Sequence, residues 1–98
     1  MAGSLAIAMR IARRYIISGR VQGVGFRHFA WSLAEREAVH GWVRNTVDGR
    51  VEIAVEGEDG PIDRFERGIR QGPPGARVDH VEVEATTPSG HNSGFIIR

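Results

Sequence analysis

The chain contains no cysteine, no lysine and no long apolar run. The absence of cysteine excludes disulfide frameworks, thiol nucleophiles and thiolate metal sites. A membrane-spanning helix needs roughly 20 consecutive apolar residues, and no run approaches that length. All thirteen basic residues are arginine, which we interpret as a compositional bias of the source. Since no feature requires an oxidising compartment, we expect a soluble, cytoplasmic protein without a membrane partner.

Acidic residues are absent from the first third of the chain. No Asp or Glu precedes Glu35, and the formal net charge is only +1. This asymmetry has two interpretations: an electropositive region that attracts anions, or acidic residues that simply cluster later in the chain. The arginines that precede Glu35 are Arg10, Arg13, Arg14, Arg20 and Arg27.

The length of 98 residues fits one domain with one hydrophobic core. We expect residues 13–98 to form this domain and residues 1–12 to be an N-terminal extension. Residues 1–12 are apolar apart from Arg10, and in composition they weakly resemble an organelle-targeting segment. A short extension of the domain is the interpretation that we favour. We also expect a monomer.

A glycine-rich stretch, Gly-Arg-Val-Gln-Gly-Val-Gly-Phe-Arg, occupies residues 19–27. Its glycines allow tight turns with positive φ and leave the main-chain N–H groups accessible. The periodicity becomes helical after Gly25, and the N–H groups at a helix start are unpaired and favour anions. Arg27 falls in the first helical turn, where a cation opposes the helix dipole. An anionic partner such as a phosphate would explain its position.

Hydrophobic periodicity predicts five strands and two helices. The strands are expected at residues 13–19, 39–45, 51–58, around 78–83 and at 95–97. The second helix is opened by Gly60-Pro61, because proline suits the first helical position, and it ends by residues 72–75. The first helix carries an apolar stripe made of Phe26, Phe29, Ala30, Leu33 and Ala34.

The second and third strands are predicted to form a hairpin. Asp48-Gly49 is a strong turn signal because both residues tolerate positive φ. In the third strand Val51, Ile53 and Val55 alternate with Glu52, Ala54 and Glu56, so we expect one face on the core and the glutamates in water. The acidic residues in general are interpreted as solvated faces. Phe26 and Trp42 are placed in the core.

The order strand, helix, two strands, helix, strand corresponds to two split βαβ units. With right-handed crossovers this gives an α+β, ferredoxin-like βαββαβ sandwich. We expect one antiparallel sheet with two helices on one face and a short C-terminal strand. That fold supports many functions, so the function must be argued from the site residues.

The inventory of catalytic groups is short. Ser18 and Ser32 have no His/Asp arrangement near them, and the four histidines show no metal-ligand spacing, so we expect no metal. A glycine loop, Arg27 and the amide of Asn45 remain, which suits phosphoryl transfer driven by positioning and charge stabilisation. A carboxylate leaves phosphate readily because its conjugate acid has a pKa of only about 4. An acyl phosphate is therefore the substrate that this set favours.

Two motifs carry a resemblance to a known family. The sequence of residues 19–27 resembles the signature of the acylphosphatases, and Gly-Trp-Val-Arg-Asn-Thr at residues 41–46 resembles their second motif. Their order and separation also fit, and the similarity covers residues 13–98. The resemblance implies a hydrolase that cleaves small acyl phosphates to a carboxylate and phosphate, with no metal or organic cofactor.

The resemblance also implies a role for each site residue. The Arg27 guanidinium and a phosphate-binding loop would hold the phosphoryl oxygens, and Asn45 would orient the water that attacks phosphorus directly. The loop would act through the main-chain amides of Gln22, Gly23, Val24, Gly25, Phe26 and Arg27.

Two alternatives use the same fold without catalysis. Residues 22–29 partly match the signature of RNA-recognition domains, but Val24 stands where a stacking aromatic is needed, and the segment begins a helix, whereas the RNA motif needs a strand. We therefore expect no nucleic-acid partner. The other alternative is an anion-binding module like the acylphosphatase-like domains inside larger carbamoyl-transfer proteins.

Overall fold

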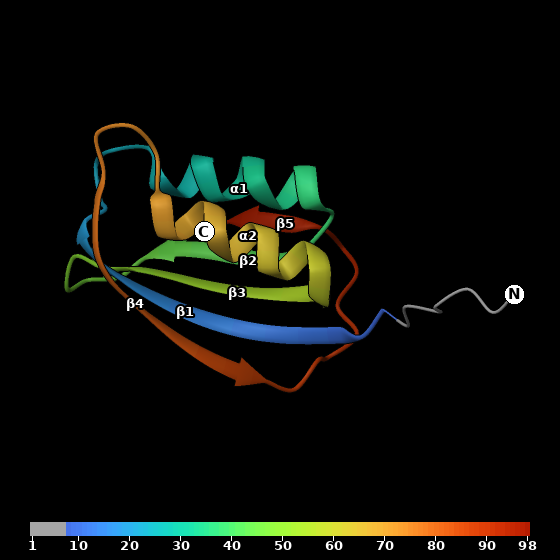
Figure 1. The fold of residues 1–98 in the computed structure, drawn as a ribbon. Helices are drawn as coiled ribbons and strands as arrows, with labels where there is room; N and C mark the ends of the chain where they lie inside the picture. Colours follow the sequence, from blue (N-terminus) through green and yellow to red (C-terminus); the bar gives the residue numbers. More distant parts are fainter. Residues whose placement is uncertain (1–7) are drawn as a thin grey trace, which may run out of the picture.

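The computed structural model describes residues 8–98 and shows a sheet with two helices over one face (Figure 1). The first seven residues of the predicted extension, 1–12, lie outside the described residues. Strand β1 already begins at Arg10, before the predicted start at Arg13. The elements in chain order are β1 (Arg10–Arg20), α1 (Phe26–Glu37), β2 (His40–Asn45), β3 (Val51–Glu58), α2 (Asp59–Gln71), β4 (Arg77–Thr86) and β5 (Phe95–Ile97).

The strands are arranged in the order β4-β1-β3-β2-β5. The four long strands pair antiparallel, and β2 and β3 form the predicted hairpin. The short strand β5 runs parallel to β2, so the sheet as a whole is mixed. The prediction of a ferredoxin-like α+β sandwich is confirmed. Within residues 8–98, neither helix has the length and apolar composition needed to pass through a membrane.

The core lies between the sheet and the two helices. Alternate residues of β1, such as Tyr15 and Ile17, are fully buried, and α2 contributes Ile62, Phe65 and Ile69. Helix α1 contributes four of the five residues of its predicted stripe, Phe29 being only partly buried. Full burial of one such side chain contributes roughly 1.5–3 kcal/mol. This packing fixes α1 over β2 and β5, and so determines where the first turn of α1 meets the sheet.

The other face of the sheet departs from the prediction. Glu52 and Glu56 were expected in water, but they are only 3% and 6% exposed. Glu52 forms ion pairs with Arg14 and Arg44 from the neighbouring strands. Burial opposes ionisation of Glu52, but the two guanidinium groups outweigh burial and lower the pKa of Glu52. The prediction failed because the neutralising arginines come from other strands.

Trp42 also departs from the prediction of a core position. Its neighbour Val43 is buried under the helices, and successive residues of a strand point to opposite faces. Trp42 is therefore half-buried on the open face of the sheet, where the guanidinium carbon of Arg98 lies 4.4 Å from its ring centroid. Phe26, in contrast, is 2% exposed, as predicted.

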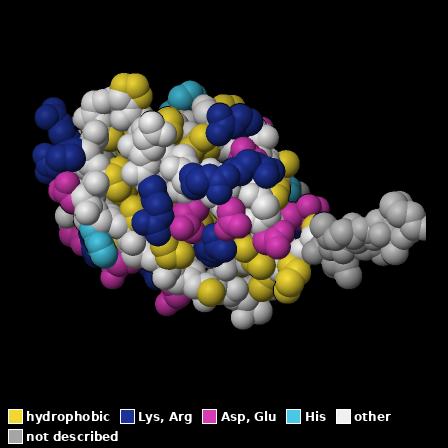
Figure 2. Space-filling view, in the orientation of Figure 1, with side chains coloured by type: hydrophobic (Ala, Val, Ile, Leu, Met, Phe, Trp, Pro, Cys, Tyr) yellow, Lys and Arg dark blue, Asp and Glu magenta, His cyan; other side chains and the backbone are white. Residues whose placement is uncertain are grey.

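Charges of both signs lie side by side over the face seen in Figure 2. Arg13 of β1 reaches Asp63 and Glu66 of α2, and Arg64 of α2 reaches Glu37 at the end of α1. Partly exposed pairs such as these contribute at most about 1 kcal/mol each. The mixed charges give this side of the molecule no field of a single sign.

Candidate active site

The loop between β1 and α1 has the backbone geometry of an anion-binding turn. Gly23 and Gly25 adopt φ values of 73° and 78°, and Gly25 is the N-cap of α1. A Cβ at either position would meet no atom of the described residues within 4 Å, so backbone conformation, rather than space, requires glycine there. Within residues 8–98, the main-chain N–H groups of residues 22–27 donate no hydrogen bond. They are free to bind an anion at the positive end of the α1 dipole.

The side chain of Gln22 fixes this loop to the β2–β3 hairpin. Its Nε2 donates to the carbonyl oxygens of Thr46 (2.8 Å) and Arg50 (2.9 Å). The hairpin is itself closed by hydrogen bonds between Thr46 and Arg50. Arg50 and then the Thr46 hydroxyl hold the pKa of Asp48 at about 2, so this carboxylate stays charged. The sequence analysis assigned Gln22 a role through its main-chain N–H group only. It missed the anchoring role of the side chain because the partners, the Thr46 and Arg50 carbonyl groups, are distant in sequence.

Arg27 and Asn45 line the same pocket, which has a volume of about 270 Å³. Arg27 is the second residue of α1, and its Nη1 donates to the main-chain oxygen of Arg98 at 3.0 Å. Asn45 is the last residue of β2 and lies on the helix side of the sheet with buried Val43. The other lining residues are Val21, Gly23, Gly25, Phe26, His28 and Ile97.

The predicted site residues therefore separate into two groups. Gly23, Gly25, Phe26, Arg27 and Asn45 line the pocket. The remaining two, Gln22 and Val24, are not among the lining residues: one anchors the loop and the other packs against the core. The sequence analysis did not indicate two further residues that line the pocket. Ile97 is placed there by the pairing of β5 with β2, and His28 by its position in the first turn of α1.

The groups that line this pocket are suited to binding a phosphoryl group. They do not form a nucleophilic catalytic site or a metal site. The pocket combines a helix N-terminus, a guanidinium, a carboxamide and N–H groups that have no partner among the residues that the structure describes, where no carboxylate side chain lines it. No group of three or more potential metal ligands occurs in the described part of the chain. The Arg27 guanidinium has five N–H donors, and one of them donates to the main-chain oxygen of Arg98. The other donors have no acceptor among residues 8–98, so they can make a planar, two-point contact with an oxyanion.

The family model named Acylphosphatase matches residues 13–97. The chain belongs to the acylphosphatase family. The acylphosphatase of Anaeromyxobacter dehalogenans (strain 2CP-C) is 50% identical to it over 92 residues, which make up 94% of this chain and 99% of that protein. The protein is accordingly an acylphosphatase that hydrolyses acyl phosphates.

Two solved structures show the same domain in different settings. The crystal structure of acylphosphatase from Bacillus subtilis matches with a TM-score of 0.86 and 38% identity, covering 90% of this chain and 98% of that one. The crystal structure of full-length HypF in the phosphate- and nucleotide-bound form matches with a TM-score of 0.82 and 31% identity, covering 96% of this chain but 12% of that chain. The domain thus occurs both as nearly a whole chain and as a small part of a larger one.

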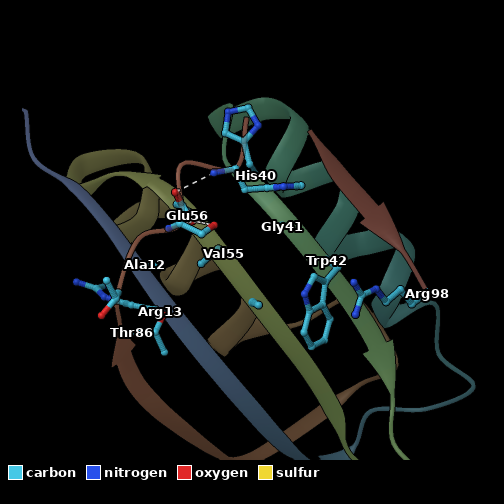
Figure 3. A pocket seen from close by; sticks show the side chains of 13 residues that line it. Ala12, Arg13, His40, Gly41, Trp42, Val55, Glu56, Thr86 and Arg98 are labelled. Carbon is cyan, nitrogen blue, oxygen red and sulfur yellow. Dashed lines mark hydrogen bonds between the residues drawn. The ribbon is translucent and has the colours of Figure 1, made fainter. Parts of the chain in front are cut away.

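A second hollow, of about 310 Å³, lies on the open face of the sheet (Figure 3). Trp42 and Arg98 lie next to each other on one side of it, away from His40 and Glu56. The Glu56 carboxylate accepts hydrogen bonds from Arg10 Nε (2.9 Å) and from main-chain N–H groups of the crossover loop, residues 87–94. Burial opposes ionisation, but the hydrogen bonds from Ser89, Arg10 and Gly90 lower the pKa of Glu56 to about 2.

The Glu56 carboxylate holds the crossover loop, which leads from β4 to β5, through hydrogen bonds from the loop's main-chain N–H groups. Its hydrogen-bonding capacity is taken up by donors of the chain itself, and no buried side-chain polar atom in residues 8–98 lacks a partner. The hollow therefore presents no buried polar group that calls for a ligand. We interpret the Glu56 carboxylate as a structural group that holds the loop leading into β5. This strand carries Ile97, and the residue after it, Arg98, accepts the hydrogen bond from Arg27.

Proposed function

We propose that acyl phosphate hydrolysis takes place in the 270 Å³ pocket, with the loop amides and Arg27 binding the phosphoryl group and Asn45 orienting water. The observation that supports this proposal is the meeting of Arg27 and Asn45 beside main-chain N–H groups that have no partner within the described residues. The two side chains come from α1 and β2, and the hydrogen bonds of Gln22 hold the loop that precedes α1 against the hairpin that follows β2.

The proposed reaction is a direct displacement at phosphorus. The water oxygen forms a bond to phosphorus as the bond from phosphorus to the acyl oxygen breaks, and the electron pair of that bond leaves with the carboxylate. One proton of the water stays on the phosphate and, near neutral pH, the other passes to solvent. The carboxylate needs no general acid because its conjugate acid has a pKa of only about 4.

Catalysis then rests on position and charge. Arg27 and the amides stabilise the charge on the equatorial phosphoryl oxygens, which is the main contribution that a protein makes to phosphoryl transfer. The Asn45 amide is too weak a base to accept the proton of the water, so we assign it the orientation of that water. Its position at the end of β2, on a strand held between β3 and β5, limits its freedom to move away.

The experiment is phosphate release from acetyl phosphate without added metal. We expect Arg27→Gln to raise KM and lower kcat, and Asn45→Ala to lower kcat chiefly, each reducing kcat/KM by about 10²–10³-fold. Matched controls are Arg67→Gln on the exposed side of α2 and Asn92→Ala in the crossover loop, because both residues lie outside the pocket. Parent-like kinetics in either site variant would show that the site is assigned wrongly.

The same preparation tests the non-catalytic alternatives. An anion-binding module would bind inorganic phosphate with no turnover of acetyl phosphate, and an RNA-binding module would bind single-stranded RNA. The RNA alternative is weakened by Val24, which packs against the core and offers no stacking surface.

The monomeric state, the cytoplasmic location and the division of the chain at residue 12 remain predictions. Sedimentation equilibrium tests the first, and localisation of the tagged full chain in its own cell tests the second. Deletion of residues 1–7, which lie outside the described residues, tests whether residues 8–98 retain the activity and the stability of the full chain.

A further inference from the structure

We infer that the rim of the active-site pocket formed by Ile97 is an acyl-group subsite that favours apolar acyl chains over the acetyl group. This inference rests on the proposed function, because it takes the loop and Arg27 as the place of the phosphoryl group. It concerns the other end of the substrate. The acyl group of a phosphoryl-bound substrate must lie against whatever surrounds the rest of the pocket.

The surroundings are set by the side chains that the phosphoryl group does not use. Val21 and Phe26 line the pocket but are only 1% and 2% exposed, so they offer little surface. Ile97 lines the same pocket and is 43% exposed. An exposed apolar side chain loses contact with water when an apolar group covers it, which is favourable.

Strand pairing fixes the position of Ile97. It lies opposite Val43 in the parallel β2–β5 ladder, and its side chain points to the helix side of the sheet, as do those of Val43 and Asn45. The next residue, Arg98, donates its N–H to the Val43 oxygen at 2.8 Å and accepts the hydrogen bond from Arg27. Ile97 is thus held one residue from the group that positions the Arg27 guanidinium.

The lining also disfavours a charged acyl group. Among residues 8–98, the only ionisable side chain that lines the pocket, apart from Arg27, which the phosphoryl group engages, is the imidazole of His28. His28 stacks on Trp31 with ring centroids 5.6 Å apart and an interplanar angle of 24°, which places an aromatic surface on α1 beside the pocket. A carboxylate at the end of the acyl chain would lose hydration there without gaining an arginine partner. An alkyl chain has no such cost.

The test compares two substrates that differ only in two methylene groups, acetyl phosphate and butyryl phosphate. The readout is the ratio of their kcat/KM values, butyryl over acetyl, in the full chain. We expect Ile97→Ala to lower this ratio about 3- to 10-fold, mainly through the KM for butyryl phosphate, because covering apolar surface on an open rim gains less than in a closed pocket. Ile97→Val should give a smaller change in the same direction.

The matched control is Ile96→Ala. Ile96 is similarly exposed, at 51%, but pairs with Trp42 in the ladder and points to the opposite face of the sheet. The butyryl-to-acetyl ratio of kcat/KM in Ile96→Ala should remain within about 2-fold of the ratio in the parent. An unchanged ratio in both Ile97 variants overturns the inference and leaves the proposed function intact. Equal losses on both substrates would also overturn it, because they would show that Ile97 acts only through Arg27. A parent that hydrolyses neither substrate would overturn the proposed function and the inference with it.

Discussion

Glu56→Gln should destabilise the protein although Glu56 lies on the opposite face from the pocket. The carboxylate has a side-chain exposure of only 8% and accepts hydrogen bonds from Arg10 and from three main-chain N–H groups of the crossover loop. A glutamine keeps one acceptor oxygen but turns an NH₂ group toward donors that met the other oxygen. Each hydrogen bond to a charged group contributes about 1.5–3 kcal/mol, and water replaces part of the loss because the loop is exposed. We expect the free energy of unfolding to fall by about 2–3 kcal/mol at pH 7.

The pH dependence gives this prediction a second measurable part. The pKa of Glu56 is lowered from its ordinary value of 4.5 to about 2 in the folded protein. A lowered folded-state pKa stabilises the protein above pH 4.5, and this contribution is lost as the pH falls toward 2. The glutamine variant lacks the titration. The difference in stability between the parent and Glu56→Gln should therefore shrink as the pH is lowered from 5 to 2.

Urea unfolding followed by tryptophan fluorescence measures both parts. The matched control is Glu84→Gln, because Glu84 is an exposed glutamate of β4 and its loss should change stability by no more than about 0.5 kcal/mol. The reasoning is refuted if Glu56→Gln costs as little as the control at pH 7. It is also refuted if the difference at pH 3 is as large as at pH 7.

Two further predictions concern the loop and the sheet. Gln22→Ala removes both hydrogen bonds to the hairpin at residues 46–50. We therefore expect kcat/KM for acetyl phosphate to fall about 3- to 10-fold, while the circular dichroism spectrum stays unchanged. Parent-like kinetics would rule out the anchoring role. Gly41→Ala should cost about 3 kcal/mol or more in urea unfolding, since φ is 143° and a Cβ would lie 1.9 Å from the Ala54 oxygen. The control Gly49→Ala has open space at φ 90°, so only backbone strain of about 1–2 kcal/mol is expected there, and equal costs at the two glycines would contradict the steric argument.

Local signals in the sequence were sufficient for the elements and for much of the candidate site. The Asp48-Gly49 turn determines the β2–β3 hairpin, and the change of periodicity after Gly25 marks the start of α1. These features depend on residues that are close in sequence, so their physics is readable there. The meeting of Arg27 and Asn45 in one pocket followed from the topology, which right-handed crossovers restrict strongly.

The parts that the sequence did not reveal depend on distant partners. Glu52 and Glu56 alternate as exposed residues should, yet arginines of β1 and β2 and the crossover loop bury them. The predicted core position of Trp42 is wrong because alternation with the buried Val43 points the Trp42 side chain to the other face of the sheet. The role of Ile97 depends on the parallel pairing of β5 with β2, and a three-residue strand carries too little pattern to fix its partner.

The strand order has a consequence for how the molecule assembles. Of the ladders in residues 8–98, only β2–β3 joins strands that follow each other along the chain; the partners of β1 begin at Val51 and Arg77. A hairpin closes within about 1–10 μs, whereas pairings between distant strands require a costly search and take milliseconds to seconds. During refolding, the turn that anchors the loop should therefore form early. Enzymatic activity should return later than the hairpin forms, when β1 docks between its two neighbours and delivers the loop to that turn.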